Sequence, residues 1–595
     1  MSSLLSRLVS VLCVAAALWS LSSSSSFAAT PRPALGQKGM AASAHPAGTS
    51  AALVILQAGG NAVDGAVAAA FAISVVEPFS TGLGGGGFAV FFDSKSKQTR
   101  ALDFRETAPA RATRAMFVDA EGKVVDGRSV DGWLSVAVPG VVPGLFELHK
   151  AHGRLPWAQL LVPAIKLAQQ GFVVGADFVD SVAWRKEALA TAGSQQVFAK
   201  RSGPARAGTA AQWAPLVVGD TLVQKDLAAT LQTLARNPRA MNDGPIARII
   251  ASEMKAHGGL IDEGDLRAYR PLWRTPLCGP YKDLVLCTMP PPSSGGVHLL
   301  QILRLLDGTD FKAGGWHDVD NTSRLIEAMR TAFADRSVWL GDPAFVDVPV
   351  AQLTSTAYAD LRRTEFDPLH ARKSSSVKAG TPEQLGLKKG SAVPPMKVRT
   401  ESQDTSHLTV VDAERNAVSL TFTVNYGFGS GIVVKGTGIL LNDEMDDFAA
   451  APGVQNSYGL VGGEANAVAP GKIPLSSMTP LIATRDGHFV LTAGAPGGST
   501  IITTTLQTVL NVVDFAMDAQ AAVSAPRIHQ QWQPESTRIE RFGFDASTQK
   551  ALEARGHIFD VKDEGWGNAM CIVQRADGTL EGGADPRGEG SAAGL

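Results

Sequence analysis

The character of the chain changes abruptly at Thr405. Residues 366–404 are rich in Ser, Pro, Gly and Lys and show no sustained periodicity, which is typical of a linker or a mobile tail. The residues that follow, TSHLTVVDAERNAVSLTFTVN, predict two β-strands joined by a polar turn at 414–416. The Thr-Ser-His cluster at the start of this pair has two interpretations. Either it is an edge strand that carries hydroxyl groups, or the chain is cut before Thr405 and this threonine becomes a new N-terminus.

The rest of the chain predicts helices and strands in a mixed order. Residues 44–76 predict two helices, and the second, NAVDGAVAAAFAISVVEP, is so apolar that most of its surface must be buried. Strands are predicted at FAVFF and ALDFR, a mainly helical region from 145 to 340, and strands followed by a buried helix after position 404. Strands that neither alternate regularly with helices nor form a separate all-β region indicate α+β layering.

Composition and the N-terminus narrow the class of protein. The 595 residues are 45% apolar and 18% charged, which suits a globular protein with a large core. The formal net charge is -2 without long runs of one sign, so nothing indicates nucleic-acid binding. Residues 1–28 predict an export signal: one arginine, the apolar run LVSVLCVAAALWSL and a small-residue cleavage pattern. The run is shorter than the roughly 20 residues of a membrane-spanning helix, so a membrane anchor is the weaker alternative. We expect a periplasmic protein with no membrane segment after signal cleavage.

Three cysteines remain after the signal. The segment LCGPYKDLVLC predicts a hairpin that turns at 282–283 and sets Cys278 opposite Cys287. A cross-strand disulfide or two free cysteines on neighbouring strands both fit this arrangement. No Cys and His cluster has the spacing of a metal site, so no structural zinc is expected.

Two glycine-rich loops are candidates for binding loops. Residues 82–87, GLGGGG, formally match a dinucleotide pattern, but a helix precedes them and a strand follows, the reverse of the order that a phosphate needs. A close-packed turn is the better interpretation. Residues 496–499, PGGS, lie between a predicted strand and a helix. Their backbone N–H groups could face an oxyanion, or the loop could be a tight connection.

Two polar loops also have two interpretations. The hydroxyl pair in PLSSM, Ser476 and Ser477, could bind a ligand or belong to an ordinary helix cap or turn. The acidic run NDEMDD, residues 442–447, lacks the ligand spacing of a calcium loop. It is either a solvated turn or a site for a cationic amino group.

The sequence lacks the usual serine-nucleophile motif, which directs attention to Thr405. No Gly-x-Ser-x-Gly elbow lies on a clear strand-to-helix turn, which weakens an α/β-hydrolase interpretation. His407 would share a strand face with Thr405, although a histidine there is more often structural. If the chain is cut before Thr405, its free α-amine can serve as the base for its own hydroxyl, since desolvation would lower the pKa of that amine.

The chain resembles the gamma-glutamyltranspeptidase family along nearly all of its mature length. The resemblance is carried, in the family's order, by GGNAVDGAVAAAFAISVVEP, GLGGGGFAV, DFRETAPA, MPPPSSGGVHLLQIL, DRSVWLGDP, DTSHLTVVD, GILLNDEMDDFA, PLSSMTP and GAPGGSTII. It implies an α+β fold of the N-terminal-nucleophile hydrolase type, a four-layer αββα sandwich. It also implies autocatalytic cleavage between Asp404 and Thr405. Residues 29–404 would form a large subunit, with 365–404 as its mobile C-terminal tail, and 405–595 a small catalytic subunit that stays associated as a heterodimer.

The resemblance also implies roles for individual residues. Thr405 is expected to be the nucleophile, Thr423 to hydrogen-bond its hydroxyl, and Gly497 and Gly498 to supply the oxyanion donors. Substrate binding is expected from a further set: Arg105, Ser476 and Ser477 for the α-carboxylate, Asn425, Glu444 and Asp447 for the α-amino end, and Tyr458 as a lid. One cation and one anion at the α-carbon of a glutamyl group would require an arginine and acidic groups together.

The implied activity is hydrolysis and transfer of γ-glutamyl groups. Glutathione and similar compounds would be donors, and water, amino acids or peptides acceptors, without metal or organic cofactor. Two rivals share the architecture. A glutaryl or cephalosporin-type acylase would have less use for acidic residues that bind an amine, and a γ-polyglutamate hydrolase would favour a more open cleft than the Tyr458 loop suggests. A non-enzymatic, uncleaved periplasmic binding protein would have lost the threonine or the glycine pair, and both are present.

Overall fold

The computed structural model describes residues 31–202, 213–387, 404–451 and 463–595. The predicted signal, residues 388–403 of the predicted tail, and Tyr458 lie outside the described residues. Residues 33–595 form one structural unit. Among the residues described, no helix combines the length and apolar character that crossing a membrane requires.

Two seven-stranded sheets form the centre of this unit, and every neighbouring pair of strands in them is antiparallel. The first sheet runs in the order β1 (Ala34–Gly36), β22 (Leu580–Ala584), β21 (Met570–Gln574), β17 (His488–Gly494), β16 (Leu481–Arg485), β11 (Leu284–Thr288) and β10 (Leu277–Tyr281). The second runs β23 (Ser591–Gly594), β2 (Gly39–Ser43), β12 (Ser406–Asp412), β13 (Ala417–Thr423), β3 (Gly86–Asp93), β4 (Gln98–Asp103) and β9 (Leu272–Arg274).

The alternation of side chains along β12 explains why the sheets form layers. Leu408 and Val410 enter the core beneath the helices that cover the second sheet. Val411 points the other way, into an apolar cluster shared by the two sheets, and the Thr409 hydroxyl donates to Thr492 Oγ1 of β17 at 2.9 Å. Because successive strand residues face opposite sides, one buried strand serves two interfaces.

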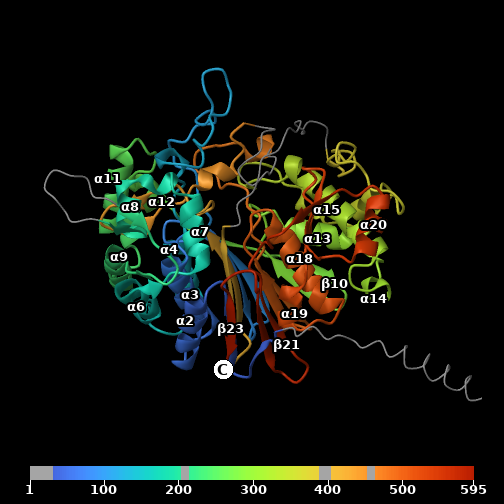
Figure 1. Cartoon of the computed structure of the whole chain (residues 1–595), viewed down its shortest axis with the longest axis horizontal. Helices are drawn as coiled ribbons and strands as arrows, with labels where there is room; N and C mark the ends of the chain where they lie inside the picture. The colour runs from blue at the N-terminus through green and yellow to red at the C-terminus, as the bar shows by residue number, and fades with distance from the viewer. Residues whose placement is uncertain (1–30, 203–212, 388–403, 452–462) are drawn as a thin grey trace, which may run out of the picture. The chain divides into compact units, whose positions relative to one another are not determined.

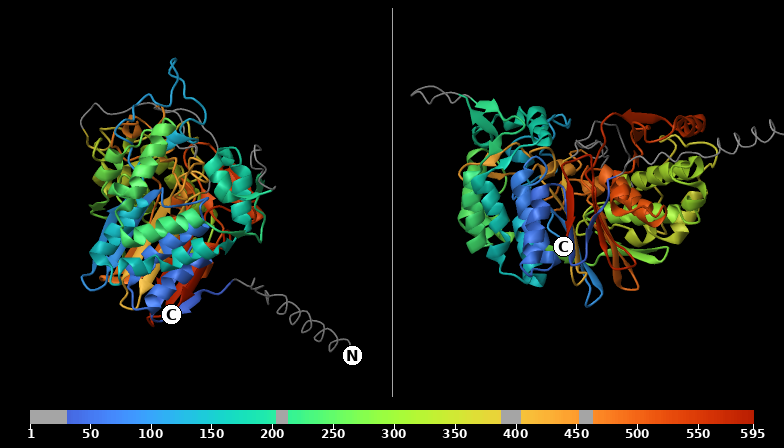
Figure 2. Two further views of the ribbon diagram at one scale, coloured as in Figure 1. Left: turned by 90° about the vertical axis from the view of Figure 1, so that its left-hand side faces the viewer. Right: turned by 60° about the horizontal axis from the view of Figure 1, so that its bottom comes forward.

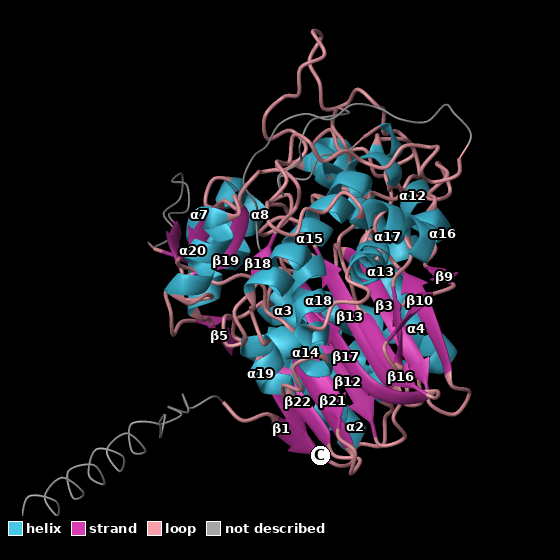
Figure 3. Cartoon of the chain, turned by 90° about the vertical axis from the view of Figure 1, so that its right-hand side faces the viewer, coloured by secondary structure: helices cyan, strands magenta, loops and turns pink. Residues whose placement is uncertain are grey.

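Helices cover the outer face of each sheet (Figures 1 and 2). The second sheet is covered by α2 (Pro46–Gln57), α3 (Ala62–Val76), α4 (Val141–His152), α6 (Val162–Gln170) and α9 (Lys225–Arg236). The first is covered by α13 (Gly295–Leu305), α15 (Val319–Trp339), α18 (Thr500–Val513) and α19 (Ala519–Ser524), the side that faces the viewer in Figure 3. The predicted αββα sandwich is therefore confirmed.

The remaining elements are short or peripheral. The helices are α5 (Trp157–Leu160), α7 (Ala176–Trp184), α8 (Ala192–Phe198), α10 (Ala240–Asp243), α11 (Pro245–Ala256), α12 (Glu263–Ala268), α14 (Phe311–Gly314), α16 (Val350–Leu353), α17 (Thr356–Arg363) and α20 (Ala546–Ala554). The strands are β5 (Phe172–Val173), β6 (Ala199–Arg201), β7 (Trp213–Pro215), β8 (Thr221–Leu222), β14 (Val433–Val434), β15 (Ile439–Leu440), β18 (Ile528–His529), β19 (Thr537–Glu540) and β20 (Phe559–Lys562).

Several local predictions can be compared with the structure. Every residue of α3 is buried, as its apolar sequence requires, and an Asn61–Asp64 capping box begins the helix. The GLGGGG run is a close-packed turn, since a Cβ on Gly85 would lie 1.8 Å from the Thr423 carbonyl oxygen. β10 and β11 pair with Cys278 opposite Cys287, and of the two alternatives for these cysteines the structure contains the disulfide.

The first part of the predicted mobile tail is tied to the body of the protein. Arg372 Nε donates to Glu327 Oε2 of α15 at 2.6 Å, and the Gly380 amide donates to Asp335 Oδ1 at 2.7 Å. The Ser374 amide donates to Glu535. Residues 365–387 thus have fixed contacts, which the composition of the segment did not predict.

Candidate active site

Thr405 lies immediately before β12, at the middle of the second sheet. The register pairs Ser406 with Phe422, so Thr405 comes opposite Thr423, the last residue of β13. The Thr405 hydroxyl donates to the Asp404 carbonyl oxygen and lies 3.2 Å from Thr423 Oγ1. Thr423 Oγ1 in turn accepts the Asn425 amide at 2.8 Å. The register of β12 and β13 therefore brings the two threonines together, and the Asn425 amide holds the Thr423 hydroxyl in place.

A small cavity on one side of Thr405 brings nine of the eleven predicted site residues together. Its lining comprises Arg105, Thr405, Thr423, Asn425, Glu444, Asp447, Ser476, Ser477, Met478, Gly498 and Ile501. Gly497 adjoins Gly498, and Tyr458 is outside the described residues. The cavity measures about 20 Å³, room for about one water molecule.

Charged side chains line this cavity and pair with one another. Arg105 follows β4 and is 1% exposed, and its guanidinium forms ion pairs with Glu444 and Asp447, which lie on one 3₁₀ turn. Burial raises the pKa of Glu444 to about 8, and burial together with Glu444 raises the pKa of Glu106 well above its ordinary value. A ligand with one carboxylate and one ammonium group could exchange partners with these ion pairs without leaving a buried charge uncompensated.

The glycine pair precedes α18 and has the geometry of an anion-binding turn. Gly497 and Gly498 have φ values of +121° and +56°, which suit glycine. Neither amide donates a hydrogen bond to any atom that the structure describes, while Thr500 folds back to donate its amide to the Gly497 carbonyl at 3.0 Å. Two free N–H groups at a helix N-terminus beside Thr405 can bind an oxyanion.

The loop with the two serines is held by the segment that follows β11. The Ser294 amide donates to the Ser476 carbonyl at 2.8 Å, and the Ser476 amide donates to the Pro292 carbonyl at 2.9 Å. The Ser476 hydroxyl accepts the Met478 amide at 3.1 Å. The hydroxyl pair therefore lies in a loop that is held by hydrogen bonds, and it does not cap a helix.

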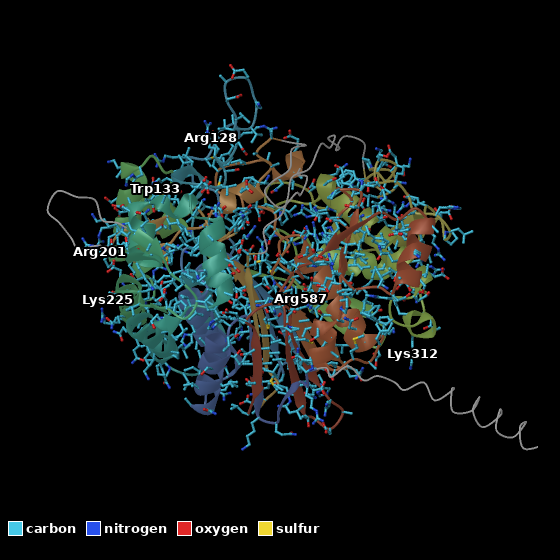
Figure 4. All side chains as sticks on the ribbon, in the orientation of Figure 1. Arg128, Trp133, Arg201, Lys225, Lys312 and Arg587 are labelled. Atoms are coloured by element: carbon cyan, nitrogen blue, oxygen red, sulfur yellow. A yellow bond between two sulfur atoms is a disulfide. The ribbon has the colours of Figure 1, made fainter. Side chains whose placement is uncertain are left out.

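The other side of Thr405 opens into a cleft of about 690 Å³. The charged side chains of its wall are mostly acidic, among them Glu77, Asp177, Asp180 and Glu564, and Arg587 of the same wall is labelled near the middle of Figure 4. Glu77 accepts the Ser406 hydroxyl at 2.8 Å, and burial raises the pKa of Glu77 to about 8. Thr405 thus lines both a small charged cavity and a wide cleft.

Some residues take a place that the sequence did not indicate. His407 does not contact the Thr405 hydroxyl; its Nδ1 lies 2.8 Å from Thr421 Oγ1, and burial lowers its pKa to about 3, so the structural interpretation is the correct one. Glu77, Glu106 and Arg336 belong to the surroundings of the site and were not predicted. All three lie in motifs that carry the family resemblance, GGNAVDGAVAAAFAISVVEP, DFRETAPA and DRSVWLGDP, which was the available signal.

Comparison with known proteins identifies the family. The family model described as gamma-glutamyltranspeptidase matches residues 48–595. The chain belongs to the gamma-glutamyltranspeptidase family. The glutathione hydrolase proenzyme of Escherichia coli (strain K12) is 42% identical over 557 residues, 93% of this chain and 91% of that protein.

Acylases of the same architecture are also similar to this gamma-glutamyltranspeptidase family member. The acylase ACY 1 proenzyme of Pseudomonas sp. (strain V22) is 36% identical over 572 residues, 95% of each chain. The crystal structure of cephalosporin acylase from Bacillus halodurans superposes with a TM-score of 0.81 at 29% identity, covering 96% of this chain and 98% of that one. The chain is an enzyme of the γ-glutamyltransferase and glutathione hydrolase class with the N-terminal-nucleophile hydrolase fold.

Proposed function

We propose that this protein is an exported precursor that cleaves itself between Asp404 and Thr405. The Thr405 hydroxyl already contacts the carbonyl group of the bond to be cut. Attack of Oγ on the Asp404 carbonyl carbon would move the acyl group from nitrogen to oxygen, and the nitrogen would take up the hydroxyl proton. Water would then hydrolyse the resulting ester, leaving a carboxylate on Asp404 and a free α-amine on Thr405.

The two products, 29–404 and 405–595, would remain associated as large and small subunits. β12 and β13 of the small subunit lie between β2 and β3 of the large one. In the other sheet, β11 of the large subunit pairs with β16 of the small one. Separation would expose both sheets along their central strands, an unfavourable loss of backbone hydrogen bonds and apolar contacts.

The mature enzyme would hydrolyse and transfer γ-glutamyl groups of glutathione and related donors. The observation that carries this proposal is the ion-paired cluster of Arg105, Glu444 and Asp447 in the same cavity as Thr405. Arg105 with Ser476 and Ser477 would bind the α-carboxylate, and Asn425, Glu444 and Asp447 the α-ammonium group.

Turnover would use the groups around the new N-terminus. The α-amine of Thr405 would take the hydroxyl proton while Oγ attacks the γ-carbonyl, and the Gly497 and Gly498 amides would bind the oxyanion. The leaving amine would depart with that proton, leaving a glutamyl ester on Thr405. Water, an amino acid or a peptide would then accept the glutamyl group.

The second candidate is a cephalosporin-type acylase, which the acylase relatives favour. Such an acylase would take glutaryl groups, which have the carboxylate but no α-amine. The ion pair between Arg105 and the buried Glu444 favours the γ-glutamyl donor, because a glutaryl carboxylate that bound Arg105 would bring no ammonium group to Glu444. A γ-polyglutamate hydrolase remains a further alternative, to be tested with polymeric donors.

The test combines maturation and specificity on one sample. Intact mass spectrometry should find two chains, the smaller beginning at Thr405, and the same sample should release aniline from a γ-glutamyl anilide faster than from a glutaryl anilide. Thr405→Ser, which keeps the hydroxyl, is the matched control for Thr405→Ala. Two chains that prefer the glutaryl anilide would establish the acylase alternative.

A further inference from the structure

Arg336 differs from the other buried arginines. It lies in the last turn of α15 and is 5% exposed. The other buried arginines in the described part of the chain each form an ion pair with a carboxylate: Arg105, Arg185, Arg330, Arg362 and Arg527. Arg336 forms an ion pair with no residue that the structure describes. A buried, unpaired guanidinium is costly, which makes a polar or anionic partner from outside the chain a specific possibility.

The contacts of Arg336 lead to the serine loop of the active site. Its Nε donates to Ser294 Oγ at 3.1 Å, and its Nη2 lies 3.5 Å from Ser477 Oγ. The Ser294 hydroxyl in turn donates a hydrogen bond to the Ser476 carbonyl oxygen at 2.8 Å. Arginine can only donate, so Ser477 must accept from it, and the Ser477 hydrogen is left to point elsewhere. Ser477 lines the cavity of Thr405.

The charge balance of the cavity supports the same role. Arg105 is shared between Glu444 and Asp447, so it cannot neutralise a substrate carboxylate without weakening one of those pairs. Arg336 adds a second positive charge beside Ser477. Burial lowers its pKa to about 10, which leaves it protonated at neutral pH. The neighbouring His298 adds no charge, because burial and Arg336 lower its pKa to about 3.

We propose that Arg336 is a positioning residue for the α-carboxylate of the donor, acting through Ser477. It makes the Ser477 hydroxyl an obligate hydrogen-bond donor toward that carboxylate and supplies the second cation of the site. The inference rests on the proposed γ-glutamyl specificity, because only a donor with an α-carboxylate would use this arrangement.

The test compares two anilides that differ in one group. The γ-glutamyl anilide carries the α-carboxylate, and the 4-aminobutyryl anilide lacks it but keeps the amine. Arg336→Met should lower kcat/KM for the γ-glutamyl anilide by about 10- to 100-fold, mainly through KM, the range of a lost charge-assisted hydrogen bond. The 4-aminobutyryl anilide should change by less than about threefold, as for surface substitutions. Arg324→Met, an exposed arginine on the same helix, should leave both rates unchanged.

Two further variants keep the proposal open to refutation. Ser477→Ala and the double variant should show effects that do not add, since Arg336 acts through that hydroxyl. If Arg336→Met does not mature, Arg336→Lys takes its place, because a lysine cannot donate to Ser294 and Ser477 in the same geometry. The loss of kcat/KM for the γ-glutamyl anilide is then compared with the loss for the 4-aminobutyryl anilide in the same way. Equal losses with both anilides in a matured variant would overturn this inference alone. A wild-type enzyme that prefers the glutaryl anilide would overturn the proposed function and this inference with it.

Discussion

The two sides of Thr405 differ in volume and in how their charges are arranged. The cavity that contains Arg105 measures about 20 Å³, and its charges are paired with one another. The cleft on the other side measures about 690 Å³, and its wall carries several carboxylates, some of them exposed. One threonine thus borders a small cavity lined by paired charges and a much larger cleft.

This difference assigns separate tasks to the two sides. In the small cavity a ligand must replace existing ion pairs, so only a group with matching charges can enter at low cost. In the wide cleft solvent screens the carboxylates, and a range of groups can be accommodated. We expect the small cavity to select the acyl group, and the wide cleft to admit leaving groups and acceptors of varied size.

The largest effect on maturation and activity is expected at Thr405, which borders both the small cavity and the wide cleft. Thr405→Ala should abolish both self-cleavage and anilide release, because the same hydroxyl attacks in each reaction. Intact mass and the release assay on one preparation provide the measurement. A variant that still yields two chains ending and starting at the normal positions would refute the mechanism.

A large effect on the rate with γ-glutamyl donors, but not on self-cleavage, is expected from Asp447 in the small cavity. Asp447→Asn should reduce kcat/KM for a γ-glutamyl anilide by about 100-fold or more, in line with the cost of removing one member of a buried ion pair. Self-cleavage should continue, since Asp447 does not contact the Asp404–Thr405 bond. The glutaryl anilide, which has no amine, serves as the control substrate. Equal losses on both anilides would show that Asp447 only maintains the cavity.

A moderate effect on stability is expected at Glu77, in the wall of the wide cleft. The pKa of Glu77 is raised from 4.5 to about 8, so the folded protein binds more protons than the unfolded chain between these values. The stability that Glu77 contributes is therefore present below about pH 4.5 and lost as the pH rises toward 8 and beyond. Glu77→Gln keeps an acceptor for Ser406 and removes the titration.

Urea unfolding at pH 5 and pH 9 measures this effect. The Glu77→Gln variant should gain stability relative to the wild type on going from pH 5 to pH 9. Glu187→Gln, at an exposed glutamate, is the matched control and should show no such gain. A difference between Glu77→Gln and wild type that is the same at both pH values would contradict the assigned protonation.

The smallest effect is expected in the wide cleft. Asp180→Asn should change kcat/KM for a γ-glutamyl anilide by less than about threefold, because an exposed carboxylate is screened by water and salt. Steady-state rates at low and high ionic strength measure this. A tenfold loss would mean that the wide cleft also selects the donor, and the division of tasks between the two sides would fail.

The amino-acid sequence was sufficient for features that depend on neighbours in the chain. The apolar α3, the strand pair that begins at Thr405, the close-packed GLGGGG turn and the Cys278–Cys287 hairpin each arise from local periodicity and turn chemistry. The αββα layers and the members of the small cavity came from the family resemblance, because motifs hundreds of residues apart carry no distance information by themselves.

The tertiary structure decided which charges meet. Arg105 pairs with Glu444 and Asp447 across more than 300 positions of sequence, and Arg336 reaches Ser477 without forming an ion pair to any carboxylate that the structure describes. The same applies to Glu77, whose raised pKa comes from burial beside Ser406. Electrostatic energy depends on distance and burial, and both are set only when the two sheets and their helices pack together. The sequence by itself thus determined the strand that begins after Thr405, and the packing of the layers determined the charged surroundings of that threonine.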